Sequence, residues 1–211
     1  QVACPQKVNA LFHHEAEASA TTVSIHEVAP YSLEPDTAAK RLQDLPRDLA
    51  VSMLNRRLSI LAKKEGAPFT RGTADVAEQF DLFRDASIEL VCKPENWNGA
   101  LEVAEQELRR ALQFGFQPAE FAEAVANFRN ELDQAVKTAS TRRSENLTRE
   151  LIQALVHGEV FTSPTDDRTL FSPALDKLTP EDCSEALRHA FAASSRFIYV
   201  AGNTQIDGPD T

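Results

Sequence analysis

Residues 100–137 constrain the fold more than any other part of the chain, because they predict two long amphipathic helices joined by a very short turn. Apolar residues recur at spacings of three and four on both sides of the turn, which places an apolar stripe along each helix. Gly115 stands where the first helix should end in a left-handed residue, and Pro118 opens the second helix, where its missing N–H is not needed. The apolar positions are Leu101, Ala104, Leu108, Ala111, Leu112, Phe121, Val125, Phe128, Leu132 and Val136.

Four stretches elsewhere alternate apolar and polar residues or are rich in β-branched residues, and we expect each to be a strand. The second and third should form a hairpin, with a turn at residues 83–86. Helices are predicted by periodicity and by capping residues. Pro46 either kinks the first helix or begins a second one there, Ser144 is a plausible N-cap, and Gly158 follows a helix end. The predicted strands are 19–28, 72–82, 87–93 and 196–201, and the further helices are 36–64, 144–157, a short one within 165–178, and 179–193.

Long helix pairs separate these strands, so the order is not a regular alternation of strand and helix. We therefore predict an α+β fold with one mostly antiparallel sheet covered by helices. A length of 211 residues, 42% of them apolar and 26% charged, suits a single globular domain. We assign residues 1–17 to a linker, 18–203 to the domain and 204–211 to a polar tail.

The charge and the cysteines exclude several classes of protein. A net charge of −10 argues against a nucleic-acid partner, because neutralising phosphates needs clustered Lys and Arg. No apolar run approaches the ~20 residues that span a bilayer. Cys4, Cys92 and Cys183 are far apart and form neither a metal motif nor a disulfide framework, and Cys92 should face the core as a small apolar residue.

No stretch carries a catalytic or metal-binding motif. A helix offers two zinc ligands only when they are three or four residues apart, and the histidines offer no such pair. No nucleophile elbow, phosphate loop or dinucleotide fingerprint is present. Glu102, Glu105 and Glu107 are expected on the solvent side of their helix. The sequence thus predicts no catalytic residue, no metal ligand and no cofactor in this chain; its histidines are His13, His14, His26, His157 and His189.

Four stretches, taken together and in this order, carry a family resemblance. They are Met-Leu-Asn-Arg-Arg-Leu at 53–58, Arg-Arg-Ala-Leu-Gln-Phe-Gly-Phe-Gln-Pro-Ala-Glu-Phe at 109–121, Leu-Val-His-Gly-Glu-Val-Phe at 155–161, and Leu-Thr-Pro-Glu-Asp-Cys-Ser-Glu-Ala-Leu at 178–187. With them the chain resembles the pitrilysin/insulinase-type zinc metallopeptidases of bacteria. The catalytic domains of that family carry His-x-x-Glu-His, which is absent here, so the chain resembles a non-catalytic domain.

The resemblance implies a function within a larger protein. It implies a structural, substrate-enclosing domain of a zinc-dependent protease, whose zinc and peptide hydrolysis belong to another domain of the same chain. Its partners would be those domains and the peptide substrate. The compartment would be the bacterial periplasm or cytoplasm, with the periplasm slightly favoured. The alternative is an independent binding or assembly protein that uses the same fold without proteolysis.

Overall fold

A computed structural model describes residues 8–79, 82–192 and 195–206, and it contains one five-stranded sheet. The order across the sheet is β1-β5-β2-β4-β3, with β1 parallel to β5 and every other neighbouring pair antiparallel. The predicted mostly antiparallel sheet and the predicted hairpin, formed by β3 and β4, are therefore confirmed. The strands are β1 Val8–His14, β2 Thr21–Pro30, β3 Arg71–Gln79, β4 Phe83–Cys92 and β5 Ser195–Gly202.

Two expectations about the strands are wrong. Residues 8–14, assigned to the linker, form strand β1, which pairs with a segment almost the whole chain away. Most β1 side chains are exposed, so the strand lacks the alternation that would have predicted it. Residues 83–86, expected as the hairpin turn, are the first residues of β4. Leu82, placed in the preceding strand, lies in the turn and is 54% exposed.

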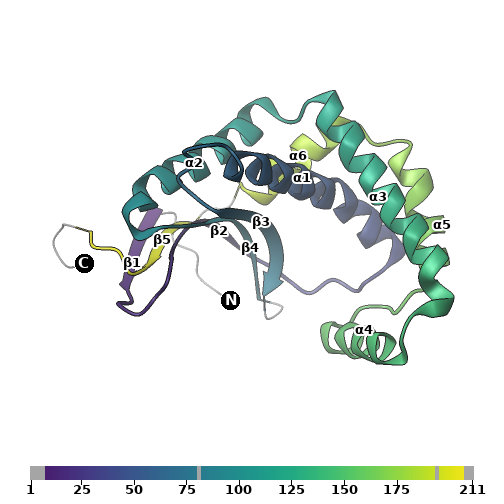
Figure 1. Cartoon of the computed structure of the whole chain (residues 1–211). Helices are drawn as coiled ribbons and strands as arrows, with labels where there is room; N and C mark the ends of the chain where they lie inside the picture. The colour runs from purple at the N-terminus through teal and green to yellow at the C-terminus, as the bar shows by residue number, and fades with distance from the viewer. Residues whose placement is uncertain (1–7, 80–81, 193–194, 207–211) are drawn as a thin grey trace.

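Helices pack on one face of this sheet (Figure 1). Helices α1 and α2 lie directly on the strands, α6 packs against both of them, and α3 with α5 forms a further layer beside α1. The α+β class with a helix-covered sheet is thus confirmed. Pro46 lies inside one continuous helix, which excludes a second helix beginning there. The helices are α1 Ala38–Ala62, α2 Trp97–Phe114, α3 Pro118–Thr138, α4 Ser144–His157, α5 Pro164–Leu175 and α6 Pro180–Ala190.

The core lies between the sheet and the α1–α2 layer. Its strand side chains alternate as a half-buried strand requires, with Val23 and Ile25 of β2 beside Ile88 and Leu90 of β4. Fully burying such a side chain stabilises the fold by about 1.5–3 kcal/mol. The apolar α2 residues buried in this core are Leu108 and three alanines, which let the helix approach closely: Ala100, Ala104 and Ala111.

A buried arginine joins α1 to the turn between α2 and α3. Arg57 of α1 donates from Nε to Glu120 Oε1 at 2.6 Å and from Nη2 to Glu120 Oε2 at 2.7 Å. The same Nη2 donates to the carbonyl oxygen of Gly115 at 2.8 Å. Its guanidinium carbon lies 4.8 Å from the ring centroid of Phe116. One side chain therefore makes a bidentate ion pair, a backbone contact and a cation–π contact at the same turn.

Helix α6 closes the same turn from the other side. Ser184 Oγ accepts a hydrogen bond from the backbone N–H of Phe116 at 3.3 Å. Gly115 has φ 65° and ψ −149°, so its φ is positive as expected, but its conformation is one that is essentially restricted to glycine. A Cβ on Gly115 would lie 2.4 Å from Ser184 Oγ. Both the backbone conformation and the approach of α6 require glycine here.

We predict that Gly115→Ala destabilises the protein by about 3 kcal/mol, because strain and a clash with Ser184 act together. The matched control is Gly158→Ala. Gly158 also has a positive φ, 67°, but nothing lies within 4 Å of its added Cβ, and its left-handed conformation should cost about 1 kcal/mol for alanine. Urea denaturation measures both free energies of unfolding. Equal losses would show that the contact with α6 does not matter.

We predict a large difference between two adjacent arginines that both pair with α3. Arg57→Met leaves Glu120 and the Gly115 carbonyl without their buried partner and should cost about 3 kcal/mol of unfolding free energy. Arg56 pairs with Glu123 at 2.9 Å, but both side chains are about half exposed, so Arg56→Met should cost less than about 1 kcal/mol. Chemical denaturation of the two variants provides the comparison, and similar losses would contradict the role of Arg57.

Candidate functional site

Within residues 8–79, 82–192 and 195–206, no group of three or more His, Cys, Asp or Glu side chains is placed to hold a metal ion. His13 and His14 are exposed on the edge strand β1, and His157 and His189 are exposed near helix C-termini. Only His26 of β2 is bonded to a carboxylate among the described histidines. Apart from the neighbours His13 and His14 on β1, the described histidines lie on different elements, and the tertiary structure brings no zinc ligand set together from them.

One of the three glutamates expected in solvent is buried, which corrects the prediction. Glu107 is 8% exposed and lies 3.5 Å from Arg110. It follows Ala104 by three residues and precedes Ala111 by four, so it shares the inward face of α2. Glu105 is partly exposed and pairs with Arg109 at 2.5 Å, while Glu102 is exposed as expected.

The sheet face opposite the helices carries a chain of three polar side chains. His26 Nδ1 donates to Asp85 Oδ2 at 2.9 Å, and His26 Nε2 lies 2.9 Å from Ser24 Oγ. Ser24 and His26 share a face because they are two residues apart on β2. Asp85 reaches them from β4, the neighbouring strand. The hydrogen bond to Asp85 raises the pKa of His26 above its usual value, although burial opposes that rise.

This arrangement has the connectivity of a Ser-His-Asp triad but not the access that catalysis needs. Ser24 is 1% exposed, so a substrate carbonyl has no route to its hydroxyl. It also lies inside a regular strand, whereas the nucleophile of a hydrolase is presented at an exposed position such as a sharp turn. The three residues therefore form a structural polar network. Sequence reasoning missed it because His26 and Asp85 are 59 residues apart, and Asp85 was assigned to a turn.

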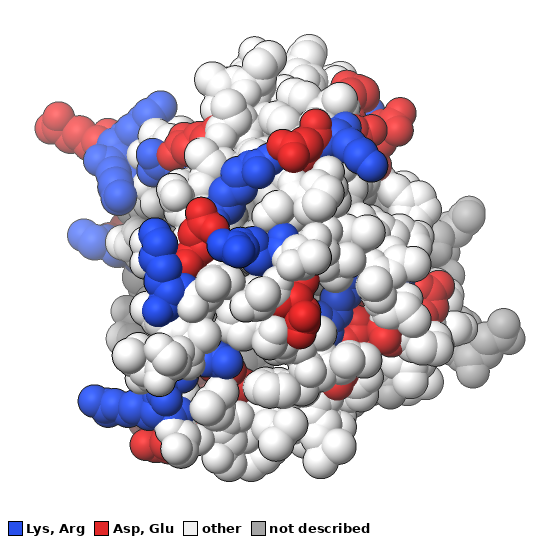
Figure 2. Space-filling model, turned by 90° about the vertical axis from the view of Figure 1, so that its right-hand side faces the viewer, with Lys and Arg blue, Asp and Glu red and all other residues white. Residues whose placement is uncertain are grey.

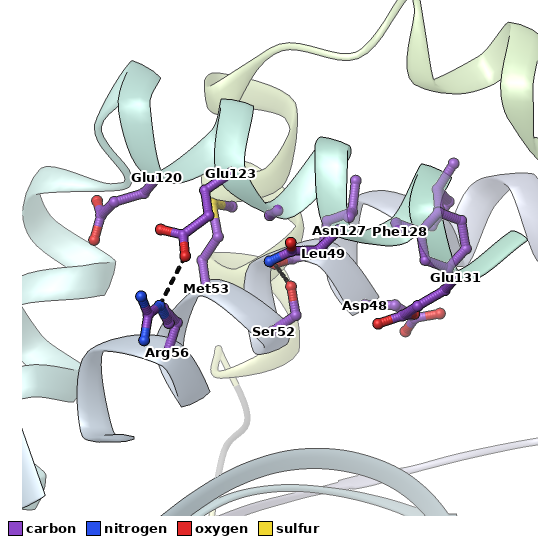
Figure 3. Close-up of a pocket in the computed structure, with 12 residues that line it drawn as sticks. Asp48, Leu49, Ser52, Met53, Arg56, Glu120, Glu123, Asn127, Phe128 and Glu131 are labelled. Carbon is purple, nitrogen blue, oxygen red and sulfur yellow. Dashed lines mark hydrogen bonds and ion pairs between the residues drawn. The ribbon is translucent and has the colours of Figure 1, made fainter. Parts of the chain in front are cut away.

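A groove of about 290 Å³ lies between α1 and α3 on the helical side of the molecule (Figure 3). Its apolar lining comes from both helices and is mostly buried. Its rim is mainly acidic: Arg56 and Glu123 pair at one end, and Asp48 and Glu131 lie at the other. The groove has room for one or two apolar side chains of a ligand, and its lining offers binding rather than chemistry. The apolar lining residues are Leu45, Leu49, Met53, Ala124 and Phe128.

The two described cysteines have no reactive character. Cys92, predicted to face the core, is 2% exposed, and Cys183 is fully buried in α6. Burial raises the pKa of the Cys92 thiol to about 11 and that of the Cys183 thiol to about 12. Both are therefore protonated near neutral pH and behave as small apolar groups. Cys4 lies outside the described residues.

The solved structures that are similar to this chain include proteases and domains of proteases. The first half of the periplasmic protease PqqL from Escherichia coli is similar with a TM-score of 0.83 and 16% identity, over 95% of this chain and 43% of that chain. A predicted insulinase family protease from Yersinia pestis has a TM-score of 0.78 and 18% identity, over 96% and 43% of the two chains. A peptidase M16 inactive domain from Pseudomonas fluorescens has a TM-score of 0.63 and 13% identity, over 97% and 45%.

The fold is shared with an insulinase family protease and with a peptidase M16 inactive domain, so the structure confirms the fold that the four short stretches of sequence implied. The chain spans less than half of the length of each of these three structures. No protein-family model and no curated protein matches the sequence. Among the described helices, none combines the length and the apolar character needed to cross a membrane.

We predict that the His26–Asp85 pair stabilises the protein in a pH-dependent way. Because the pKa of His26 is raised in the folded state, its contribution is complete below the pKa of the unfolded histidine and is lost as the pH rises through the folded-state pKa. The difference in unfolding free energy between wild type and Asp85→Asn should therefore be larger at pH 5.5 than at pH 8.5, two test values on either side of about 6.5.

The control for this experiment is Asp75→Asn. Asp75 is exposed on β3, and it pairs in register with Ser87, which in turn pairs with His26. Its removal should change stability by less than about 0.5 kcal/mol at either pH, as is usual for surface substitutions. Urea denaturation at both pH values would contradict the assignment if Asp85→Asn and Asp75→Asn gave the same pH dependence.

Proposed function

We propose that this chain is a non-catalytic domain of a larger zinc-dependent protease, in which it encloses the peptide substrate together with other domains. The observation that supports this most is the fold match, which covers nearly all of this chain but under half of each protease structure. The name of the Pseudomonas fluorescens structure describes an inactive domain of the same fold. A fold alone does not establish a function, and the proposal therefore also rests on the side chains that the fold presents.

The described side chains do not fit a catalytic zinc site. Such a site needs about three protein ligands around one ion and an open position for water. His26 is held by Asp85 and Ser24, and no other described histidine lies in a group of three metal-binding side chains. In the proposed parent protein the zinc would activate water in another domain. This chain would form part of the wall that surrounds the peptide substrate.

The sheet face that carries His26 is the surface we assign to the substrate space. Helices α1 and α2 lie on the other side of the sheet (Figure 1). The side chains of this face are mostly half-buried, and they combine polar groups with the rings of Phe197 and Tyr199 on β5. Such a surface can contact a peptide through aromatic rings and hydrogen bonds without reacting with it.

We predict that the purified, tag-free chain retains no stoichiometric zinc after dialysis and does not cleave a quenched fluorescent peptide. The complete polypeptide that contains this chain should hold about one zinc per molecule and should cleave the same peptide until a chelator is added. Elemental analysis and fluorescence measure the two properties on the same samples. Zinc near one equivalent with chelator-sensitive cleavage by this chain alone would overturn the non-catalytic assignment.

Measurements on the complete polypeptide also distinguish the protease domain from the alternative, an independent binding or assembly protein. If the polypeptide contains a zinc-dependent peptidase, the domain belongs to a protease. If the complete polypeptide has neither zinc nor peptidase activity, the proposal fails, and the independent binding or assembly protein is the better description.

A further inference from the structure

Helix α4 differs from the other helices in the position of its apolar side chains. Four aliphatic residues of this 14-residue helix are largely exposed: Leu151 and Ile152 are each 52% exposed, Leu155 81% and Val156 71%. Only Ala154 of this helix is buried. A contiguous apolar surface of this kind on a soluble protein usually marks a contact site.

The four residues lie on one side of α4, because spacings of one, three and four fall within one arc of a helix. Just beyond the helix, Val160 and Phe161 are also exposed, at 56% and 44%. In Figure 2, the lowest part of the molecule, where α4 lies in Figure 1, is mostly uncharged. Val160 and Phe161 line the recess between α4 and α1, so we call only the four aliphatic residues of the helix the α4 face: Leu151, Ile152, Leu155 and Val156.

The domain holds α4 mainly through the segment that follows it. Asp36 accepts a hydrogen bond from the backbone N–H of Val160 at 2.8 Å, and Arg41 donates to the carbonyl oxygen of Val160 at 2.6 Å. A recess of about 1090 Å³ separates much of α4 from the N-terminal part of α1 and the segment before it. The helix is therefore tethered at one end but is not packed along its length.

A helix in this position needs a partner. Isolated helices of about 12–15 residues are marginal in water, and most helical stability in proteins comes from packing an apolar face. The domain supplies that packing to α1 and α2, whose apolar stripes are buried, and to α3, whose apolar residues are buried or partly buried against the core. It does not supply it to the α4 face. The part of the chain that the structure describes leaves these side chains open to solvent.

We propose that the α4 face docks on a neighbouring folded domain of the same polypeptide. This inference rests on the proposed function, since the protease structures with this fold contain more than twice the length of this chain. An apolar centre surrounded by charges of both signs is the usual composition of a protein interface. Residues 142–159 provide such a rim, with three arginines and three glutamates: Arg142, Arg143, Arg149, Glu145, Glu150 and Glu159.

The charge of the chain favours a protein over a membrane surface as the occupant. The rim of the α4 face has no excess of Lys and Arg, and the whole chain has a net charge of −10. Helices that lie on anionic membranes carry many basic residues on their polar side. A folded domain with an apolar patch of its own matches the α4 face better.

The test compares hydrogen exchange of residues 147–157 in this chain alone and in the complete polypeptide. We expect the amides of α4 to exchange at least ten times more slowly in the complete polypeptide. The double variant Leu155→Ser/Val156→Ser, made in the complete polypeptide, should return them to the rates of the isolated chain. Phe114→Ser is the matched control, because Phe114 of α2 is 73% exposed but lies outside the α4 face. That variant should leave the exchange of α4 unchanged.

Three results would overturn the proposal. Equal exchange of α4 in the chain and in the complete polypeptide would show that no domain covers this face. A concentration-dependent dimer of the isolated chain, abolished by the double variant, would assign the face to a second copy. Binding of the isolated chain to anionic lipid vesicles, lost in the same variant, would assign it to a membrane.

Peptidase activity of the complete polypeptide, measured on the same samples, keeps this proposal separate from the proposed function. Activity with unprotected α4 amides would contradict only the docking surface. Protected α4 amides in a polypeptide without peptidase activity would contradict only the protease assignment.

Discussion

The helical layer depends on the ion pair between the buried guanidinium of Arg57 and Glu120. The guanidinium fixes α1 to the turn between α2 and α3 through Glu120 and the Gly115 carbonyl, and it stacks on Phe116. The ion pair lowers the pKa of Glu120 below its usual value, so the carboxylate stays charged through the neutral range. A charge buried in this way is tolerated only because its main hydrogen bonds are made. The Gly115 carbonyl supplies one of those hydrogen bonds, so the turn and the arginine are held together.

Three of the four stretches that carry the family resemblance meet at this point. Arg57 belongs to residues 53–58, Gly115 and Glu120 to residues 109–121, and Ser184 to residues 178–187. The fourth stretch, residues 155–161, lies apart and is held by Arg41 and Asp36. The stretches that carry the resemblance are thus used here for architecture. This explains how a chain without a zinc ligand set among its described residues has the fold of a protease domain.

The two faces of the sheet also differ in what their side chains do. On the helical side, apolar residues of β2 and β4 form the core with α1 and α2. On the other side, His26, Asp85 and Ser24 satisfy one another's hydrogen bonds at a half-buried surface. A polar group removed from water must be paired. Both ring nitrogens of His26 are used in this pairing, so its role here is structural. In our proposal, this face and the α4 face are the two surfaces through which the domain serves a larger protein.

The sequence by itself determined the parts of the fold that depend on local physics. The helical hairpin and the 144–157 helix were predictable because apolar periodicity acts over a few residues. The N-cap expected at Ser144 is wrong, because Arg143 is the N-cap and Ser144 is the first residue of α4. The spacing of Glu107 from Ala104 and Ala111 also indicates that it is buried, although its burial was not predicted. The choice between a kink and a second helix at Pro46 was not decided locally, because packing of α1 against its neighbours outweighs the lost hydrogen bond.

Only the tertiary structure decided which distant residues meet. Strand β1 has no inward alternation and exists because β5 offers it a parallel edge. His26 met Asp85, and Arg57 met Glu120, across 59 and 63 residues of chain. The exposure of the α4 face was likewise decided by the tertiary structure. Its apolar pattern predicts an amphipathic helix correctly, but periodicity states only that a helix has an apolar side. Whether that side meets the domain's own core or another surface is decided by chain connectivity and by the space left in the core.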